Sequence, residues 1–141
     1  MKKRASLIRY RQWQVDEQRR KLADLYAVAE DLALQARNLE TTLASEQEKA
    51  KRSSHLSFAY PGFAEQAVKR RENLKRTSDE IDSQIETAKG ELSELFQELK
   101  KIEILDQRQG EREQAEIRKS EDQQLDELAG DRHRRSAARP S

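Results

Sequence analysis

The sequence is poor in the residues that build compact domains or interrupt helices. It has no cysteine, 4 glycines and 2 prolines among 141 residues, and aromatic residues make up only 5%. The absence of cysteine excludes disulfides and thiolate metal sites. So few aromatic residues cannot fill a large three-dimensional core, although the chain can still bury a narrow seam between helices.

Long apolar runs are missing as well. No stretch approaches the roughly 18 residues of a membrane-spanning helix. A chain without cysteine also suits a reducing compartment. We therefore expect a cytoplasmic protein.

The groups that catalysis needs are also scarce. The two histidines, His55 and His133, are not spaced as metal ligands with each other. The sequence contains no glycine-rich loop of the kind that holds phosphates. Carboxylates are abundant, but on a rod of helices they lie in water with no pocket around them. We expect neither enzymatic activity nor a bound metal or cofactor.

The residues that are abundant favour long helices. Charged residues make up 39% of the chain and hydrophobic residues 34%, whereas the net charge of +1 points to no class of partner. A turn-like cluster around Pro61-Gly62 separates two helical patterns. We predict an all-α fold, a single domain over residues 1–131, with helices at 6–53 and 63–129 and a turn at 54–62. The two helices form an antiparallel coiled-coil hairpin with a C-terminal helical overhang, and residues 130–141 form a flexible basic tail.

Apolar residues recur every seven residues in both predicted helices. A strict repeat of this kind specifies a left-handed coiled coil, in which positions a and d form the seam. The a positions of the first helix and the d positions of the second are apolar throughout. They are Ile8, Val15, Leu22, Ala29, Ala36, Leu43 and Ala50 in the first helix, and Ala67, Leu74, Ile81, Ala88, Leu95 and Ile102 in the second.

Charged residues on the seam select one register. With a turn near Phe58, three of them face an opposite charge, whereas a shift by one heptad would set lone charges against leucines. In a parallel homodimer, the alternative, each would face its own copy. We therefore favour the hairpin and expect a monomer. The predicted pairs are Glu46 with Arg71, Arg11 with Asp106 and Arg4 with Glu113, and Lys21 is expected near Glu98.

Nucleic-acid binding is a weaker interpretation. The N-terminal segment is basic and leads into heptads, as in basic-zipper factors. However, Ile8 and Val15 continue the seam through this segment, and its arginines find acidic partners in the second helix. We expect no nucleic-acid partner.

Three places remain for contacts with other proteins. Trp13 lies off the seam, where it either rests along its own helix or anchors an interface. Along the overhang the seam positions become polar, so this face is either solvated or offered to another protein. At the tip, Phe58, Tyr60 and Phe63 either close the hairpin or form a contact patch.

Two stretches resemble the FliJ family of the bacterial flagellar type III export apparatus. Leu7-Ile8-Arg9-Tyr10-Arg11, with Asp16-Glu17 and Leu22 after it, is similar to the start of the family. The stronger match is Leu105-Asp106-Gln107-Arg108-Gln109, followed after a helical stretch by Asp122-Gln123-Gln124-Leu125-Asp126-Glu127-Leu128-Ala129.

The resemblance implies a fold like the stalk (gamma) subunit of rotary ATPases. Members insert the end that carries both termini into the hexameric export ATPase FliI and promote its assembly and activity. They also bind the export gate FlhA and escort export chaperones. The resemblance therefore implies peripheral association with the cytoplasmic face of the inner membrane, through partners. The residues expected at the ATPase are Arg9, Arg11, Trp13, Arg108, Arg112 and Ile117.

Four positions match the face with which the family binds the gate: Phe63, Ala67, Arg70 and Leu74. Only Phe63 clearly keeps the residue type of the family, and Arg70 stands where the family has a small apolar residue. Two alternatives share the predicted shape. One is the stalk protein of an injectisome, a virulence type III secretion system, and the other is a cytoplasmic coiled-coil scaffold with no link to an ATPase.

Overall fold

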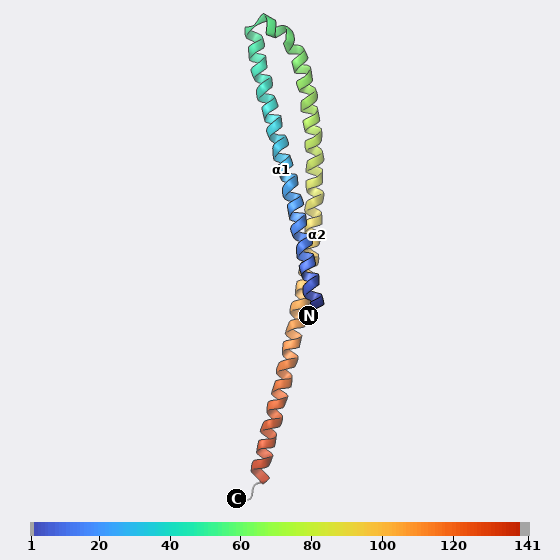
Figure 1. The fold of residues 1–141 in the computed structure, drawn as a ribbon, viewed down its shortest axis with the longest axis vertical. Helices are drawn as coiled ribbons and strands as arrows, with labels where there is room; N and C mark the ends of the chain where they lie inside the picture. Colours follow the sequence, from blue (N-terminus) through green and yellow to red (C-terminus); the bar gives the residue numbers. More distant parts are fainter. Residues whose placement is uncertain (1, 139–141) are drawn as a thin grey trace. The chain divides into compact units, whose positions relative to one another are not determined.

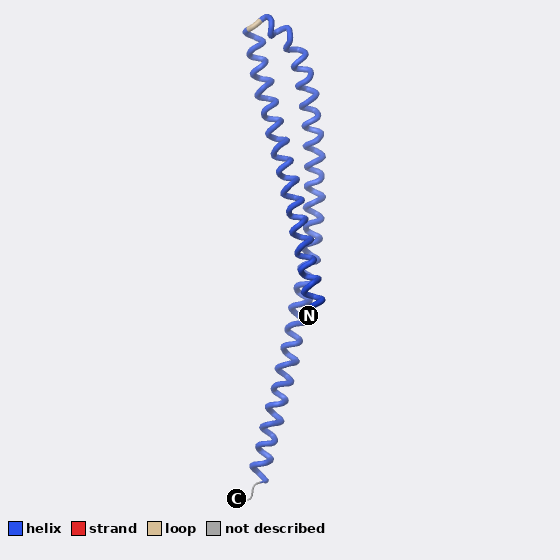
Figure 2. Tube along the Cα trace, in the orientation of Figure 1, coloured by secondary structure: helices blue, strands red, loops and turns tan. Residues whose placement is uncertain are grey.

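The structure is a computed structural model that describes the backbone of residues 2–138. Two helices, α1 (Lys2–Arg52) and α2 (Ser54–Ala138), account for all of these residues except Ser53. The helices are shown as ribbons in Figure 1, and the single non-helical residue is the tan segment in Figure 2. The prediction of an all-α fold with two long helices packed against each other is confirmed.

The connection between the helices is much shorter than the turn that we expected at 54–62. Ser53 caps α2, because its Oγ accepts a hydrogen bond from the N–H of Leu56 (3.5 Å) and its carbonyl accepts one from the N–H of Ser57 (2.9 Å). A serine in this position satisfies backbone donors at the start of a helix, so the next helix begins at once. The sequence signal of Pro61-Gly62 was therefore misread as a turn.

Pro61 lies inside α2. Proline has no N–H to donate to the carbonyl four residues earlier, and its ring crowds that carbonyl, so it bends a helix. The first part of α2, drawn green in Figure 1, runs across the end of the hairpin before it turns to lie beside α1. The bend replaces most of the loop that a hairpin of two straight helices would need.

The C-terminal boundary also differs from the expected one. Gly130 was expected to start the tail, yet α2 continues through it to Ala138. No described glycine has a positive φ, so none of them ends the helix with a left-handed cap. The rest of the expected tail, residues 139–141, lies outside the described residues.

The chain divides into two compact units. The hairpin unit is Arg11–Phe96, and the overhang unit is Met1–Tyr10 together with Gln97–Ser141.

In the hairpin unit, α1 and α2 run antiparallel and bury a seam of small and aliphatic residues. All of its buried residues occupy a or d positions of these heptads, with Leu32 at a d position of the first helix and Ile85 at an a position of the second, which confirms the heptad assignment. They are Val15, Leu32, Ala50, Ala67, Leu74, Ile85 and Ala88.

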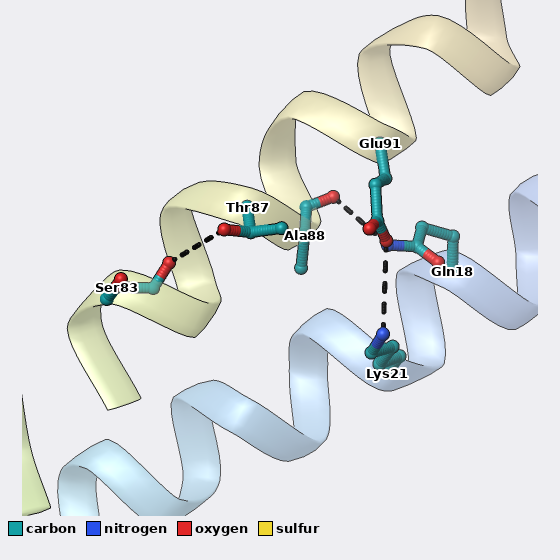
Figure 3. Close-up of polar contacts among 6 residues, drawn as sticks. All are labelled: Gln18, Lys21, Ser83, Thr87, Ala88 and Glu91. Carbon is teal, nitrogen blue, oxygen red and sulfur yellow. Dashed lines mark hydrogen bonds and ion pairs between the residues drawn. The ribbon is translucent and has the colours of Figure 1, made fainter. Parts of the chain in front are cut away.

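A polar layer also links the two helices of the hairpin unit (Figure 3). Gln18, at a d position, donates from its side-chain amide to the backbone carbonyl of Ala88 (3.2 Å) and to the Glu91 carboxylate (2.9 Å). Ala88 is only 1% exposed, and its small side chain lets Gln18 reach the backbone. Lys21 lies 3.9 Å from Glu91. Lys21 was expected near Glu98, but its ion pair is with Glu91, and Glu98 lies 3.4 Å from Lys101 on its own helix.

At one level of the hairpin unit the residues at seam positions are not buried. Ala36 and Arg71 hold seam positions but are exposed. The Arg71 guanidinium donates to both carboxylate oxygens of Glu40, at 2.6 and 3.0 Å. Glu46, predicted to pair with Arg71, instead lies 3.6 Å from Lys49 on its own helix. The arginine is long enough to reach an acid that flanks the seam, where both groups remain in water.

A groove of about 480 Å³ opens between the helices at this level. Small and polar residues at the seam leave this space, because Ala36 and Ser78 replace the larger side chains found elsewhere. The groove is lined by Leu32, Ala33, Ala36, Arg37, Leu39, Glu40, Thr41, Arg71, Leu74, Lys75 and Ser78.

In the overhang unit, the first turns of α1 lie against α2 through Arg4. Its guanidinium lies 3.4 Å from Glu113, as predicted, and 3.4 Å from Asp106. Asp106 was predicted to pair with Arg11, but Arg11 donates to Gln14 on its own helix (3.1 Å). Beyond Glu113, every residue of α2 from 114 to 129 is exposed. The predicted helical overhang is therefore present.

Candidate partner-binding surfaces

Two of the residues expected at the ATPase come together in the overhang unit. Arg108 and Arg112 are one turn apart on α2, and both are exposed. With Arg4, Leu105 and Gln109 they line a hollow of about 270 Å³. The hollow thus has three guanidinium groups at its walls, of which Arg4 is already paired with Asp106 and Glu113. It is suited to a carboxylate or to a backbone carbonyl.

Sequence reasoning missed Leu105 and Arg4 as members of this surface. Leu105 is 61% exposed and gives the arginine hollow an apolar wall. The signal was available, because Leu105 is an apolar residue off the seam, one turn before Arg108. Arg4 was assigned only to an ion pair with Glu113.

Two further ATPase candidates of the overhang unit lie elsewhere in it. Ile117 is 57% exposed on the overhang of α2, beyond the level of Glu113. Leu125 and Leu128 are exposed farther along the same helix. Arg9 is exposed on α1, with one guanidinium nitrogen 3.5 Å from the Ser6 hydroxyl.

Arg11 and Trp13 belong to the hairpin unit. Arg11 is half-buried, its Nε is buried without a hydrogen-bond partner, and its Nη1 donates to Gln14. The Arg11 side chain therefore lies mainly in the seam and exposes little surface to a partner. Trp13 is 57% exposed, which suits an interface anchor.

The four gate candidates divide between the surface and the seam of the hairpin unit. Ala67 and Leu74 are buried, as d positions of the coiled coil, and cannot reach a partner without opening the hairpin. Phe63 is exposed at the margin of the seam, and Arg70 is exposed and donates to Gln35 across the hairpin (3.3 Å). Only Phe63 and Arg70 remain as surface groups of this face.

The electrostatics of the surface are those of solvated helices. A raised pKa is found at Lys89, where hydrogen bonding to the Tyr26 hydroxyl and then to the Glu86 carboxylate favours the charged amine. The Lys89 Nζ lies 6.0 Å from the centre of the Tyr26 ring and 3.3 Å from Glu86. Within residues 2–138 no group of His, Asp and Glu side chains could hold a metal ion. Neither described helix has a segment long and apolar enough to cross a membrane.

Comparison with known proteins identifies one family. A family model described as "Flagellar FliJ protein" matches residues 1–138. No curated protein and no solved structure matches the chain. The match extends over both helices, including the hollow at Arg108 and the exposed part of α2. The chain therefore belongs to the FliJ family of flagellar proteins, which indicates a function related to flagellar export.

Proposed function

We propose that this protein is a non-enzymatic stalk of the flagellar type III export apparatus, which inserts into the hexameric export ATPase, promotes its assembly and stimulates its activity. The observation that carries the proposal is the exposed continuation of α2 beyond Glu113. A long helix without a partner along this stretch exposes a surface that its own chain does not cover.

The dimensions of this stretch suit the centre of a ring. Residues 114–138 remain helical, which at 1.5 Å per residue gives a single helix roughly 35 Å long. A single helix with its side chains is only about 10–12 Å wide. Its exposed charges form weak, exchangeable ion pairs, which allow contact with the lining of a ring without fixing one orientation.

The arginine hollow supplies a more specific contact. Arg108 and Arg112 line the same hollow as the exposed Leu105, so a partner can place an acidic group between the guanidiniums and an apolar group on the leucine. Exposed Ile117 adds a second apolar contact beyond it. We assign these residues to the ATPase.

The same proposal includes the contacts that link the stalk to the rest of the apparatus. We place the export gate FlhA at Phe63 and Arg70, the two gate candidates that are exposed. Export chaperones are further partners. These contacts would hold the protein at the cytoplasmic face of the inner membrane. The flagellar description of the family favours this system over an injectisome.

Stimulation of the purified export ATPase tests the proposal. Arg108→Glu combined with Arg112→Glu should abolish most of the stimulation, because two attractive contacts become repulsive. Arg19→Glu combined with Arg20→Glu reverses the same amount of charge on exposed residues of the hairpin unit and should leave stimulation intact. Equal stimulation by all three proteins would refute the assignment.

A scaffold without an ATPase link is the competing class. Such a protein would tether its partners by forming a dimer, whereas the stalk enters a ring as one copy. Sedimentation of the pure protein separates the two. We expect an elongated monomer, and an obligate dimer would support the scaffold.

A further inference from the structure

The tip of the hairpin unit, residues 49–64, carries one large exposed side chain, Phe58, that the proposed function does not use. Phe58 is 91% exposed, more than any other large hydrophobic residue described. Leu56 and Phe63 are also exposed, and Tyr60 is half-buried. These apolar groups lie at the same end of the hairpin unit, with Phe58 on one side of α2 and Leu56 and Phe63 nearer the other. Exposed apolar groups at one end of a molecule can contact another surface.

Phe58 lies on the side of α2 that faces away from the seam. In helical projection it is opposite Tyr60 and Ala64, both of which are half-buried toward α1. Its neighbours one turn away on either side are Ser54 and Gly62, and a Cβ added to Gly62 would meet no atom within 4 Å. Phe58 therefore stands on a convex, uncrowded and uncharged surface instead of in a groove.

Within residues 49–64 the charge has one sign, and Glu48 and Glu65 border this segment. Residues 49–64 contain Lys49, Lys51 and Arg52 and no acidic residue. All three are exposed in the last turn of α1. Lys49 and Lys51 reach back to acids on the preceding turn, Glu46 (3.6 Å) and Glu48 (3.5 Å). Such exposed pairs contribute little to stability and exchange readily, so the ammonium groups can turn to another anion.

We propose that the tip binds the surface of an anionic lipid bilayer, with Phe58 inserted at the boundary between headgroups and acyl chains and with Lys49, Lys51 and Arg52 on lipid phosphates. Basic residues next to exposed aromatic and aliphatic residues are the combination that holds a short helix in this interface. A convex tip needs no matching pocket in a fluid bilayer, whereas a protein partner would have to supply one. This direct lipid contact is separate from any contact with the ATPase or the gate.

Binding of the full-length chain to vesicles tests the charge contribution. The chain should bind phosphatidylcholine vesicles that contain phosphatidylglycerol, bind pure phosphatidylcholine far less, and lose affinity as salt is added. Lys51→Glu with Arg52→Glu should weaken binding at least about thirtyfold, given about 1 kcal/mol for each basic residue near an anionic surface. Arg19→Glu with Arg20→Glu is a matched control, because Arg20 also pairs with an acid on the preceding turn, Glu17 (2.9 Å). An equal loss in this control would mean general charge attraction and would overturn the proposal.

The insertion of Phe58 has its own test. Phe58→Ser should weaken vesicle binding roughly fivefold to tenfold, and Leu34→Ser, at an exposed site on α1, should have little effect. The chain has no cysteine, so Phe58→Cys can carry a single environment-sensitive fluorophore. Its emission should shift to the blue on phosphatidylglycerol vesicles, while the same label at Leu34→Cys should not. A label at position 58 that stays in water on vesicles, or that shifts only when a protein partner is added, would overturn the proposal. ATPase stimulation of Phe58→Ser should be normal, so failure here is distinct from failure of the proposed function.

Discussion

The guanidinium of Arg4 on α1 lies 3.4 Å from a carboxylate oxygen of Glu113 on α2. A second oxygen at 3.4 Å belongs to Asp106, one heptad earlier on α2, so a single arginine spans two levels of the overhang unit. After Glu113 every residue of α2 is exposed up to Ala129. The bridge therefore marks the level from which α2 continues as an exposed helix.

The contribution of this bridge to stability should be small. Both carboxylates are more than two-fifths exposed, so solvent screens the attraction. In a double-mutant cycle with Arg4→Ala and Glu113→Ala, we expect a coupling of about 0.5 kcal/mol in the free energy of unfolding, measured with denaturant. The cycle of Arg4→Ala with Glu116→Ala is the control and should be additive. If the coupling free energy between Arg4 and Glu113 cannot be distinguished from zero, the contact is contradicted.

The buried seam should provide most of the stability of the hairpin unit. Leu74→Ala removes a buried side chain and should lower the free energy of unfolding by about 2–3 kcal/mol. Leu34→Ala, at an exposed position, should change it by less than about 0.5 kcal/mol. Thermal or chemical denaturation measures both. A similar loss in the two variants would show that the predicted seam is not the core.

The groove beside Ala36 is a site where the protein can be made more stable. Ala36→Leu fills part of the space next to Leu32, Leu39 and Leu74, and should raise the free energy of unfolding by about 0.5–1.5 kcal/mol. Ala27→Leu on the exposed side of α1 is the control and should have no comparable effect. Destabilisation by Ala36→Leu would mean that the groove cannot accept the larger side chain.

The seam could be predicted from the sequence because it depends on a local repeat. Positions a and d recur every seven residues in both helices, and antiparallel pairing follows once the charges on the seam are matched. Ala88 and Ile85 are buried for this reason. This seven-residue repeat can be recognised without knowing the loops or the contacts between distant residues.

The exceptions arise where long side chains have a choice of partner. Arg71 reaches Glu40 instead of Glu46, and Arg4 takes Asp106 as well as Glu113. The heptad register places one residue opposite each arginine on the other helix. The arginine side chain is long enough to span a full helical turn, so it can pair with a different acid that remains better hydrated. Sequence matching therefore indicated the register but not every pair.

The candidate surfaces depend on which side chains the fold leaves exposed, and a motif does not give this. Ala67 and Leu74 matched a family pattern for the gate, but the same heptad that predicts the fold buries them in the seam. The hollow formed by Arg108, Arg112 and Leu105 depends on which faces α2 leaves exposed. Pro61-Gly62 suggested a loop. The cap that starts α2 earlier depends on the single residue Ser53, which is a weak signal in the sequence.

Lys89 provides a test of surface electrostatics. Its pKa is raised, first through the hydrogen bond to Tyr26 and then through Glu86, so the folded state holds this proton more tightly than the unfolded state. The stabilising contribution is therefore fully present below the ordinary lysine pKa of about 10.4 and is lost as pH rises through the higher folded pKa. Tyr26→Phe should lower the pKa of Lys89, followed by the NMR shift of its side-chain carbon next to the amine. An unchanged pKa in Tyr26→Phe would exclude the tyrosine as the main cause.

Insertion of the overhang into the ATPase ring is the central claim, and a crosslink from Ile117 tests it most directly. The chain has no cysteine, so Ile117→Cys can carry one photoactivatable crosslinker, and Leu34→Cys carries the same reagent as the control. After illumination with the assembled export ATPase, we expect Ile117→Cys to form one crosslink per hexamer, to residues that line the centre of the ring, and Leu34→Cys to form none there. Crosslinks from Ile117→Cys only to the outer surface of the ATPase, or only to a second copy of this chain, would contradict the account.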